Sequence, residues 1–122
     1  MPTPRQAAFG ALGERLACRE LRRRGYAILA RGFRTRHGEI DIVARDGDVL
    51  VFVEVKTRAS RRYGTALEAV TARKQRRIAA MARSYLARAG WGERPCRFDV
   101  VAVTGRTPGE ADVTVVRNAF SL

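Results

Sequence analysis

The feature that most constrains the fold of this chain is an Asp-Gly pair, Asp46-Gly47, between two mostly apolar runs, residues 39–45 and 49–56. This dipeptide between alternating apolar runs is a strong signal for a β-hairpin with a two-residue turn. If the pair itself forms the turn, it fixes every cross-strand pair of the hairpin. The turn therefore decides which side chains share each face of the two strands.

In this register the hairpin has one partly charged face and one apolar face. Ile40 lies opposite Val53. Glu39 lies opposite Glu54, with Asp41 diagonal to Glu54. The charged face carries Glu39, Asp41, Val43, Leu50, Phe52, Glu54 and Lys56. The apolar face carries Ile40, Ile42, Ala44, Val49, Val51, Val53 and Val55. Diagonal partners lie ~7–8 Å apart at the backbone, so both carboxylates can reach one cation.

Asp41, Glu54 and Lys56 together point to a narrow range of chemistry. Two carboxylates bind Mg²⁺ or Mn²⁺ through oxygen ligands, and a lysine beside the metal can activate a water or stabilise a phosphoryl oxygen. We therefore expect metal-assisted hydrolysis of a phosphodiester. The alternative is an amphipathic hairpin whose charges face water. Against it, Leu50 and Phe52 share the charged face, and a strand that is apolar on both sides is usually covered on both.

The net charge of +12, from 24 Lys and Arg against 12 Asp and Glu, predicts a polyanionic partner, either nucleic acid or an anionic membrane surface. Arginine supplies most of this charge, which suits bidentate phosphate contacts. No run approaches the ~18 apolar residues of a membrane span, and no apolar signal segment opens the chain. Two isolated cysteines, Cys18 and Cys96, indicate buried thiols rather than disulfides or zinc. We expect a cytoplasmic nucleic-acid-binding protein with no membrane partner.

Hydrophobic periodicity and turn residues predict one domain over residues 1–122, with a core from about 9 to 120 and the order α-β-β-β-α-β-β. The predicted helices are 9–24 and 71–89, and the predicted strands are 26–33, 39–45, 49–56, 97–103 and 112–117. The strand after the second helix can run parallel to an earlier one, because a helix provides the crossover. The fold class is α/β, a small mixed central β-sheet with flanking helices.

Two basic segments flank the charged strand face. "KTRASRRYG" begins at Lys56, where arginines can contact phosphates and a tyrosine can stack on a base or sugar. "TARKQRR" opens the second helix, where cations oppose the helix dipole and a phosphate partner would explain them. The predicted nucleic-acid contacts are Arg58, Arg61, Arg62, Tyr63, Arg73, Lys74, Arg76 and Arg77. The alternative for both segments is a solvated basic surface.

Two further residues stand out singly. His37 is the only histidine, and we expect it to be exposed, with a supporting role near the site as the alternative. Asp99 interrupts the apolar strand 97–103. We expect a structural acid paired with an arginine, with a role in the site as the alternative.

The order of the motifs resembles a known nuclease superfamily. "EIDIV" followed by "EVK" resembles the D…(D/E)xK signature of the PD-(D/E)xK nucleases, which have the restriction-endonuclease-like fold. More closely, GEID, FVEVKTR and RFDVV in this order resemble the YraN family of small bacterial proteins, related to archaeal Holliday junction resolvases. The likeness runs from about Gly10 to Phe120.

The resemblance implies roles for the charged side chains. Asp41 and Glu54 would be metal ligands for Mg²⁺ or Mn²⁺, with the carbonyl of Val55 as a further ligand, and Lys56 would be the catalytic lysine. Such an enzyme would be an endonuclease that cuts DNA, in particular branched or recombining DNA. As a homodimer it would cut two strands symmetrically. The alternative is a non-catalytic nucleic-acid-binding protein on the same fold.

The resemblance also implies two accessory catalytic residues. Glu14 would be an additional carboxylate, because "GALGE" fits a GxxxE motif of some superfamily members. Gln75 would be the glutamine that related nucleases use from this helix. Members with a QxxxY motif have a tyrosine four residues later, where this chain has Ala79.

Overall fold

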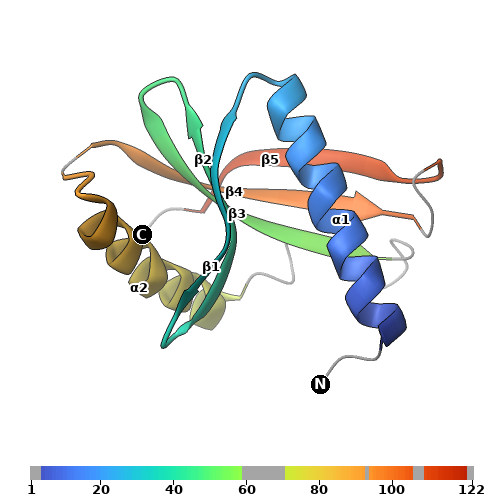
Figure 1. Cartoon of the computed structure of the whole chain (residues 1–122), viewed down its shortest axis with the longest axis horizontal. Helices are drawn as coiled ribbons and strands as arrows, with labels where there is room; N and C mark the ends of the chain where they lie inside the picture. Colours follow the sequence, from blue (N-terminus) through green and yellow to red (C-terminus); the bar gives the residue numbers. More distant parts are fainter. Residues whose placement is uncertain (1–3, 59–70, 93, 106–108, 121–122) are drawn as a thin grey trace.

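The computed structural model of the protein describes residues 4–58, 71–92, 94–105 and 109–120. Its elements are α1 (Pro4–Arg23), β1 (Ala27–Thr35), β2 (Gly38–Asp46), β3 (Val49–Arg58), α2 (Ala72–Ala89), β4 (Cys96–Thr104) and β5 (Asp112–Phe120). The predicted order and the α/β class are confirmed. The five strands form one sheet in the order β1-β2-β3-β4-β5 (Figure 1).

The sheet is mixed, as predicted. β3 and β4 pair in parallel, because α2 provides the crossover between them, and all other neighbouring strands are antiparallel. α2 begins after Thr71, whose hydroxyl accepts a hydrogen bond from the backbone N–H of Lys74, and it ends at Gly90 in the left-handed conformation. The arrangement is consistent with the restriction-endonuclease-like fold.

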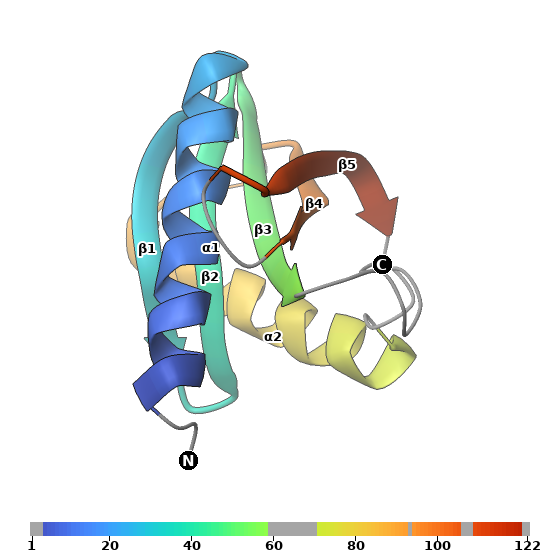
Figure 2. The same ribbon diagram turned by 90° about the vertical axis from the view of Figure 1, so that its right-hand side faces the viewer.

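The two helices lie on opposite faces of the sheet (Figures 1 and 2). The α1 side buries Ala17, Cys18, Leu21, Tyr26, Ile42, Ala44, Val51, Val53, Val101 and Val103. The α2 side buries Ile40, Val43, Leu50, Phe52, Ile78, Met81, Ala82, Phe98, Val100 and Phe120. The charged strand face therefore lies under α2. Neither helix of the described chain is long and apolar enough to cross a membrane.

The predicted register of the β2–β3 hairpin is wrong by two residues, because Val53 pairs with Ile42 rather than with Ile40. The two-residue loop is Gly47-Asp48, not Asp46-Gly47. Gly47 takes the first loop position with φ of 61°, a conformation that glycine adopts without strain. Because side chains alternate with a period of two, this displacement keeps most of them on the predicted faces.

Ile40 and Glu39 are the exceptions. Ile40 packs in the α2-side cluster rather than with Ile42, so its predicted place on the apolar face is wrong. The predicted pairing of Glu39 with Glu54 is also wrong, because the β2–β3 pairs end at Ile42 and Glu39 pairs with Arg34 in β1. β1 shifts register just before this region, and such a bulge adds local twist that turns the strand ends.

Candidate metal centre and nucleic-acid interface

Asp41 and Glu54, the two predicted metal ligands, lie where β2 and β3 stop pairing. Continuing the register one residue past the last pair puts Asp41 directly opposite Glu54, rather than diagonal to it. The backbone N–H of Val55 donates a hydrogen bond of 2.8 Å to Oδ2 of Asp41. The side chain of Asp41 thus satisfies a β3 amide where the strand ladder ends, and this contact fixes the carboxylate beside Glu54.

The two carboxylates are poorly hydrated and repel one another. Glu54 is only 9% exposed, and Asp41 is half-buried. Burial, and then the charge of Glu54, raise the pKa of Asp41 to about 7; Glu14 on α1 adds to this shift. A cation held between the two carboxylates would attract their charged forms and so offset both burial and repulsion, which suits the pair to a hard divalent ion.

Two lysines contact the same oxygen of Glu54. The Nζ of Lys74, from α2, lies 2.5 Å from Oε1, and the Nζ of Lys56 lies 3.5 Å from it. Burial, and then the neighbouring Lys74 ammonium, lower the pKa of Lys56. Burial alone would also lower the pKa of Lys74, but the hydrogen bonds to Glu54 and Lys56 and the charges of Glu54 and Asp41 together outweigh burial and raise that pKa. Of the two, Lys56 therefore releases its proton more easily.

Asp41, Glu54 and Lys74 border a hollow of about 250 Å³ between the β1–β2 turn and α2, and Lys56 lies beside Glu54 without being among the lining residues. The hollow is lined by His37, Gly38, Glu39, Asp41, Glu54, Lys74, Arg77, Ile78 and Met81. The carboxylates lie on the β2 and β3 strands, and the cations of Lys74 and Arg77 extend from α2. A hollow with acidic and basic sides can hold a divalent cation next to a phosphate group.

The other two carboxylates near the site are paired with arginines. Arg31 Nε lies 3.6 Å from Oε1 of Glu14, and Arg34 Nε lies 3.4 Å from Oε2 of Glu39. Within the described ranges, no three His, Cys, Asp or Glu side chains gather as a metal site. Mg²⁺ fits such a donor set, because it binds through one or two carboxylates and completes its shell with water and substrate phosphates.

The helix presents Lys74 to Glu54. Gln75 is half-buried but does not line the hollow, so its catalytic role stays a prediction. Lys74 was expected only to contact phosphate. Lys74 precedes Ile78 by four residues and Met81 by seven, so it lies on the same stripe of the helix as these buried side chains. This helical periodicity could have predicted that the Lys74 side chain points toward the sheet.

The remaining predicted nucleic-acid contacts fall into three groups. Arg77 lines the hollow, and Arg73 and Arg76 are exposed on the first turns of α2. Arg58 ends β3, and its Nε is buried without a hydrogen-bond partner among the described residues. The other three, Arg61, Arg62 and Tyr63, lie outside the described residues. His37 is exposed, as expected, and it also borders the hollow.

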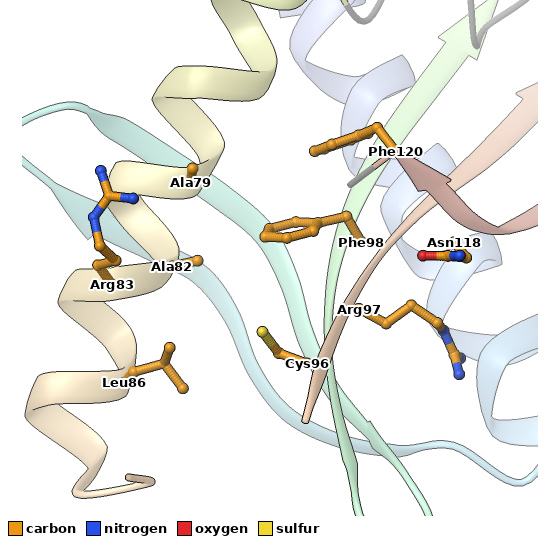
Figure 3. Close-up of a pocket in the computed structure, with 9 residues that line it drawn as sticks. All are labelled: Ala79, Ala82, Arg83, Leu86, Cys96, Arg97, Phe98, Asn118 and Phe120. Carbon is orange, nitrogen blue, oxygen red and sulfur yellow. The ribbon is translucent and has the colours of Figure 1, made fainter. Parts of the chain in front are cut away.

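A second hollow, of about 290 Å³, lies on the α2 side between that helix and β4 and β5 (Figure 3). The rings of Phe98 and Phe120 point toward α2, and the guanidinium of Arg97 points away. Cys96, expected to be buried, is exposed at this hollow. Its lining among the described residues contains no carboxylate, unlike that of the first hollow.

Asp99 is a structural acid paired with an arginine, as predicted. Its fully buried carboxylate accepts hydrogen bonds of 2.9 Å from the hydroxyl of Tyr26, from Nε of Arg97 and from the backbone N–H of Asn118. Arg97 also contacts Asp46 at 3.0 Å. The network joins Tyr26, which directly precedes β1, to β2, β4 and β5 on the α1 side, away from the carboxylate pair.

Comparison with known proteins places this site inside a matched region. A family model described as "Uncharacterised protein family UPF0102" matches residues 13–103, which include β2, β3 and α2. A UPF0102 protein of Symbiobacterium thermophilum is 56% identical over 91% of this chain and 94% of its own. Relatives in Geobacter sulfurreducens and Pseudomonas aeruginosa are 49% and 46% identical, over 93% and 91% of this chain and 89% and 90% of their own.

Proposed function

This chain belongs to the UPF0102 family, and from its carboxylate pair and adjoining lysines we propose that it is a divalent-cation-dependent endonuclease that hydrolyses phosphodiester bonds in DNA. The observation that carries the proposal is the contact of Lys56 with the buried Glu54 opposite Asp41. The resemblance to PD-(D/E)xK nucleases assigns metal binding to the two carboxylates and catalysis to the lysine. The relationship of the YraN family to Holliday junction resolvases favours branched or recombining DNA as the substrate.

The carboxylates, the Val55 carbonyl and Lys56 each have a distinct part in such a reaction. Asp41, Glu54 and the carbonyl of Val55 would hold Mg²⁺ or Mn²⁺. The bound cation would offset the negative charge of the scissile phosphate and its surroundings. Lys56, whose pKa is lowered, would take a proton from the attacking water or stabilise charge on a phosphoryl oxygen.

The start of α2 would bind the DNA backbone beside this centre. Arg77 borders the hollow, and the exposed Arg73 and Arg76 extend the positive surface along the helix. The net charge of +12 would speed encounter with a polyanion and make binding sensitive to salt. Cutting two strands symmetrically would require two copies of the chain.

A cleavage assay tests this function. Plasmid DNA, a four-way DNA junction and a structured RNA are each incubated with the protein in Mg²⁺, in Mn²⁺ and in EDTA. We expect metal-dependent cleavage of DNA that is lost in Glu54→Gln and Lys56→Ala, while both variants still bind DNA. Glu110→Gln, which changes an exposed carboxylate, is the matched control and should cut like wild type.

The alternative is a non-catalytic nucleic-acid-binding protein on the same fold. The observation that favours it is that Glu39, the third carboxylate at the hollow, pairs with Arg34, and no three His, Cys, Asp or Glu side chains gather as a metal site in the described part of the chain. Wild type that binds DNA with ordinary salt dependence but never cuts any of the three substrates would support this alternative over the nuclease.

A further inference from the structure

We propose that Lys74 is an internal counter-ion, which keeps the carboxylate pair closed to divalent cations until a nucleic-acid phosphate draws its ammonium away. The inference rests on the proposed function and concerns the order in which metal and substrate bind. In the described structure the Lys74 ammonium lies against Glu54, a carboxylate that would bind the metal.

The contact is part of the packed structure rather than a surface ion pair. Thr71 caps α2 and bonds the backbone N–H of Lys74, and Ile78, one turn further on, is buried against the sheet. The side chain of Lys74 is 25% exposed and that of Glu54 is 10% exposed. The helix thus aims Lys74 at Glu54, and the low exposure limits screening by solvent.

With both carboxylates ionised, two negative and two positive charges already balance at the site without a metal. Two carboxylates, Asp41 and Glu54, lie close to two ammonium groups, those of Lys56 and Lys74. A dication added to this group would leave excess positive charge in a poorly hydrated space. One ammonium must therefore move away when a metal binds.

Lys74 is the lysine that can leave. Lys56 is two residues from Glu54 on the same strand, so the strand holds it beside the site. Lys74 comes from the facing helix, on a flexible side chain, and borders the same hollow as Arg77. A phosphate bound by Arg77 would offer Lys74 a second anionic partner within that hollow.

This arrangement makes metal and nucleic acid bind with positive coupling. A phosphate that draws Lys74 from Glu54 frees a ligand for the metal, and the metal in turn keeps Lys74 available for the phosphate. Coupling between two binding events is reciprocal, so each should raise the affinity of the other by the same factor. The free protein would hold Mg²⁺ weakly.

Titration with Mn²⁺ alone, followed by the electron paramagnetic resonance signal of the free ion, tests the counter-ion directly. Lys74→Gln should bind Mn²⁺ roughly tenfold more tightly than wild type, since the competing ammonium is gone. Arg73→Gln is the matched control, because it removes the same charge from an exposed neighbour on the same turn. Its Mn²⁺ affinity should change by no more than about twofold. Lys74→Met serves as a second neutral variant if Lys74→Gln unfolds.

DNA binding tests the coupling. The affinity for a labelled four-way junction is measured by fluorescence anisotropy in EDTA and in Mn²⁺, in a Lys56→Ala background that should not cut. Mn²⁺ should tighten binding more in Lys56→Ala than in the Lys56→Ala/Lys74→Gln double variant. An equal effect of Mn²⁺ in both would overturn the inference.

The outcomes separate this inference from the proposed function. If wild type cuts DNA but neither neutral variant binds Mn²⁺ more tightly, the nuclease stands and the counter-ion is rejected. Equal tightening in Arg73→Gln and Lys74→Gln would show a general charge effect and also reject it. If no variant binds Mn²⁺ and wild type never cuts, both fail. If the carboxylate pair of Asp41 and Glu54 is the metal site, Glu54→Gln should lose Mn²⁺ binding.

Discussion

The ammonium of Lys74 in α2 lies 2.5 Å from Oε1 of Glu54 in β3. This ion pair joins the helix to the sheet across the hollow, and Lys56 adds a second cation to the same oxygen. Glu54 is therefore the common counter-charge for two partly buried lysines. Its role in holding the fold can be measured separately from any role in catalysis.

Removing the Glu54 charge should destabilise the protein. Glu54→Ala leaves two neighbouring ammonium groups without their anion, and we expect a loss of about 2–4 kcal/mol in the free energy of unfolding. Glu39→Ala, at an exposed carboxylate paired only loosely with Arg34, should cost less than about 1 kcal/mol. Urea denaturation by circular dichroism measures both. Equal losses in the two variants would mean that the Glu54 contacts do not stabilise the fold.

The raised pKa of Asp41 predicts an unusual dependence of stability on pH. Its pKa is about 7 in the folded chain, against 3.8 for an ordinary aspartate. Between these values the folded chain keeps a proton that the unfolded chain has released, so raising the pH favours unfolding. The contribution of Asp41 should fall by up to about 1.4 kcal/mol per pH unit across this window and be fully lost above about pH 7.

Comparison with Asp41→Asn isolates this effect. The difference in unfolding free energy between wild type and Asp41→Asn, followed from pH 4 to pH 8, should shift steadily in favour of the variant. Adding Mg²⁺ at pH 8 should restore more stability to Lys74→Gln than to the Asp41→Asn/Lys74→Gln double variant, because the competing ammonium is absent from both and the metal binds only the folded carboxylate pair. A constant difference across the pH range would contradict the assigned pKa.

The sequence predicted the charged strand face because side-chain alternation depends only on odd and even positions. Asp41 and Glu54 therefore line one hollow and Lys56 contacts Glu54, although the turn was placed wrongly at Asp46-Gly47. Both candidate loops, Asp46-Gly47 and Gly47-Asp48, contain Gly47. They differ in whether this glycine, with its positive φ, takes the second or the first loop position. Dipeptide preference alone cannot separate two loops that share one glycine.

The contact between Lys74 and Glu54 was not predictable in the same way. It joins two elements that meet only after the crossover from β3 through α2 has formed. Lys74 lies in a run of basic residues, in which Arg73, Arg76 and Arg77 carry the same charge. Charge alone therefore does not identify the residue that contacts Glu54. Only the helical phase set by Ile78 distinguishes Lys74 from its neighbours.

The buried Asp99 network should contribute to stability and not to the metal site. Asp99→Ala leaves the guanidinium of Arg97 and the hydroxyl of Tyr26 without their acceptor, so we expect a loss of about 3–5 kcal/mol. Tyr26→Phe removes a single hydroxyl and should cost about 1–2 kcal/mol. Urea unfolding gives both values. Mn²⁺ affinity in Tyr26→Phe should match wild type, and a marked change would place the network in the metal site.

Two glycines of α1 should respond in opposite directions to the same substitution. A Cβ at Gly13 would collide with the side chain of Thr57 at the end of β3, whereas a Cβ at Gly10 would meet open space. Gly10→Ala should stabilise the protein by about 0.5–1 kcal/mol, because alanine favours the helix. Gly13→Ala should destabilise it by about 1–3 kcal/mol, because α1 must move away from β3.

The double variant Gly13→Ala/Thr57→Ala identifies the cause of that loss. Removing Oγ1 and Cγ2 of Thr57 makes room for most of the new methyl group, although the Cβ of Thr57 still lies 3.0 Å from its position. The double variant should therefore be more stable than the sum of the two single losses predicts, by about 1 kcal/mol. Thermal and urea unfolding of the four proteins in this cycle measure the coupling. Strict additivity would show that α1 and β3 do not approach as closely at Gly13 as the structure describes.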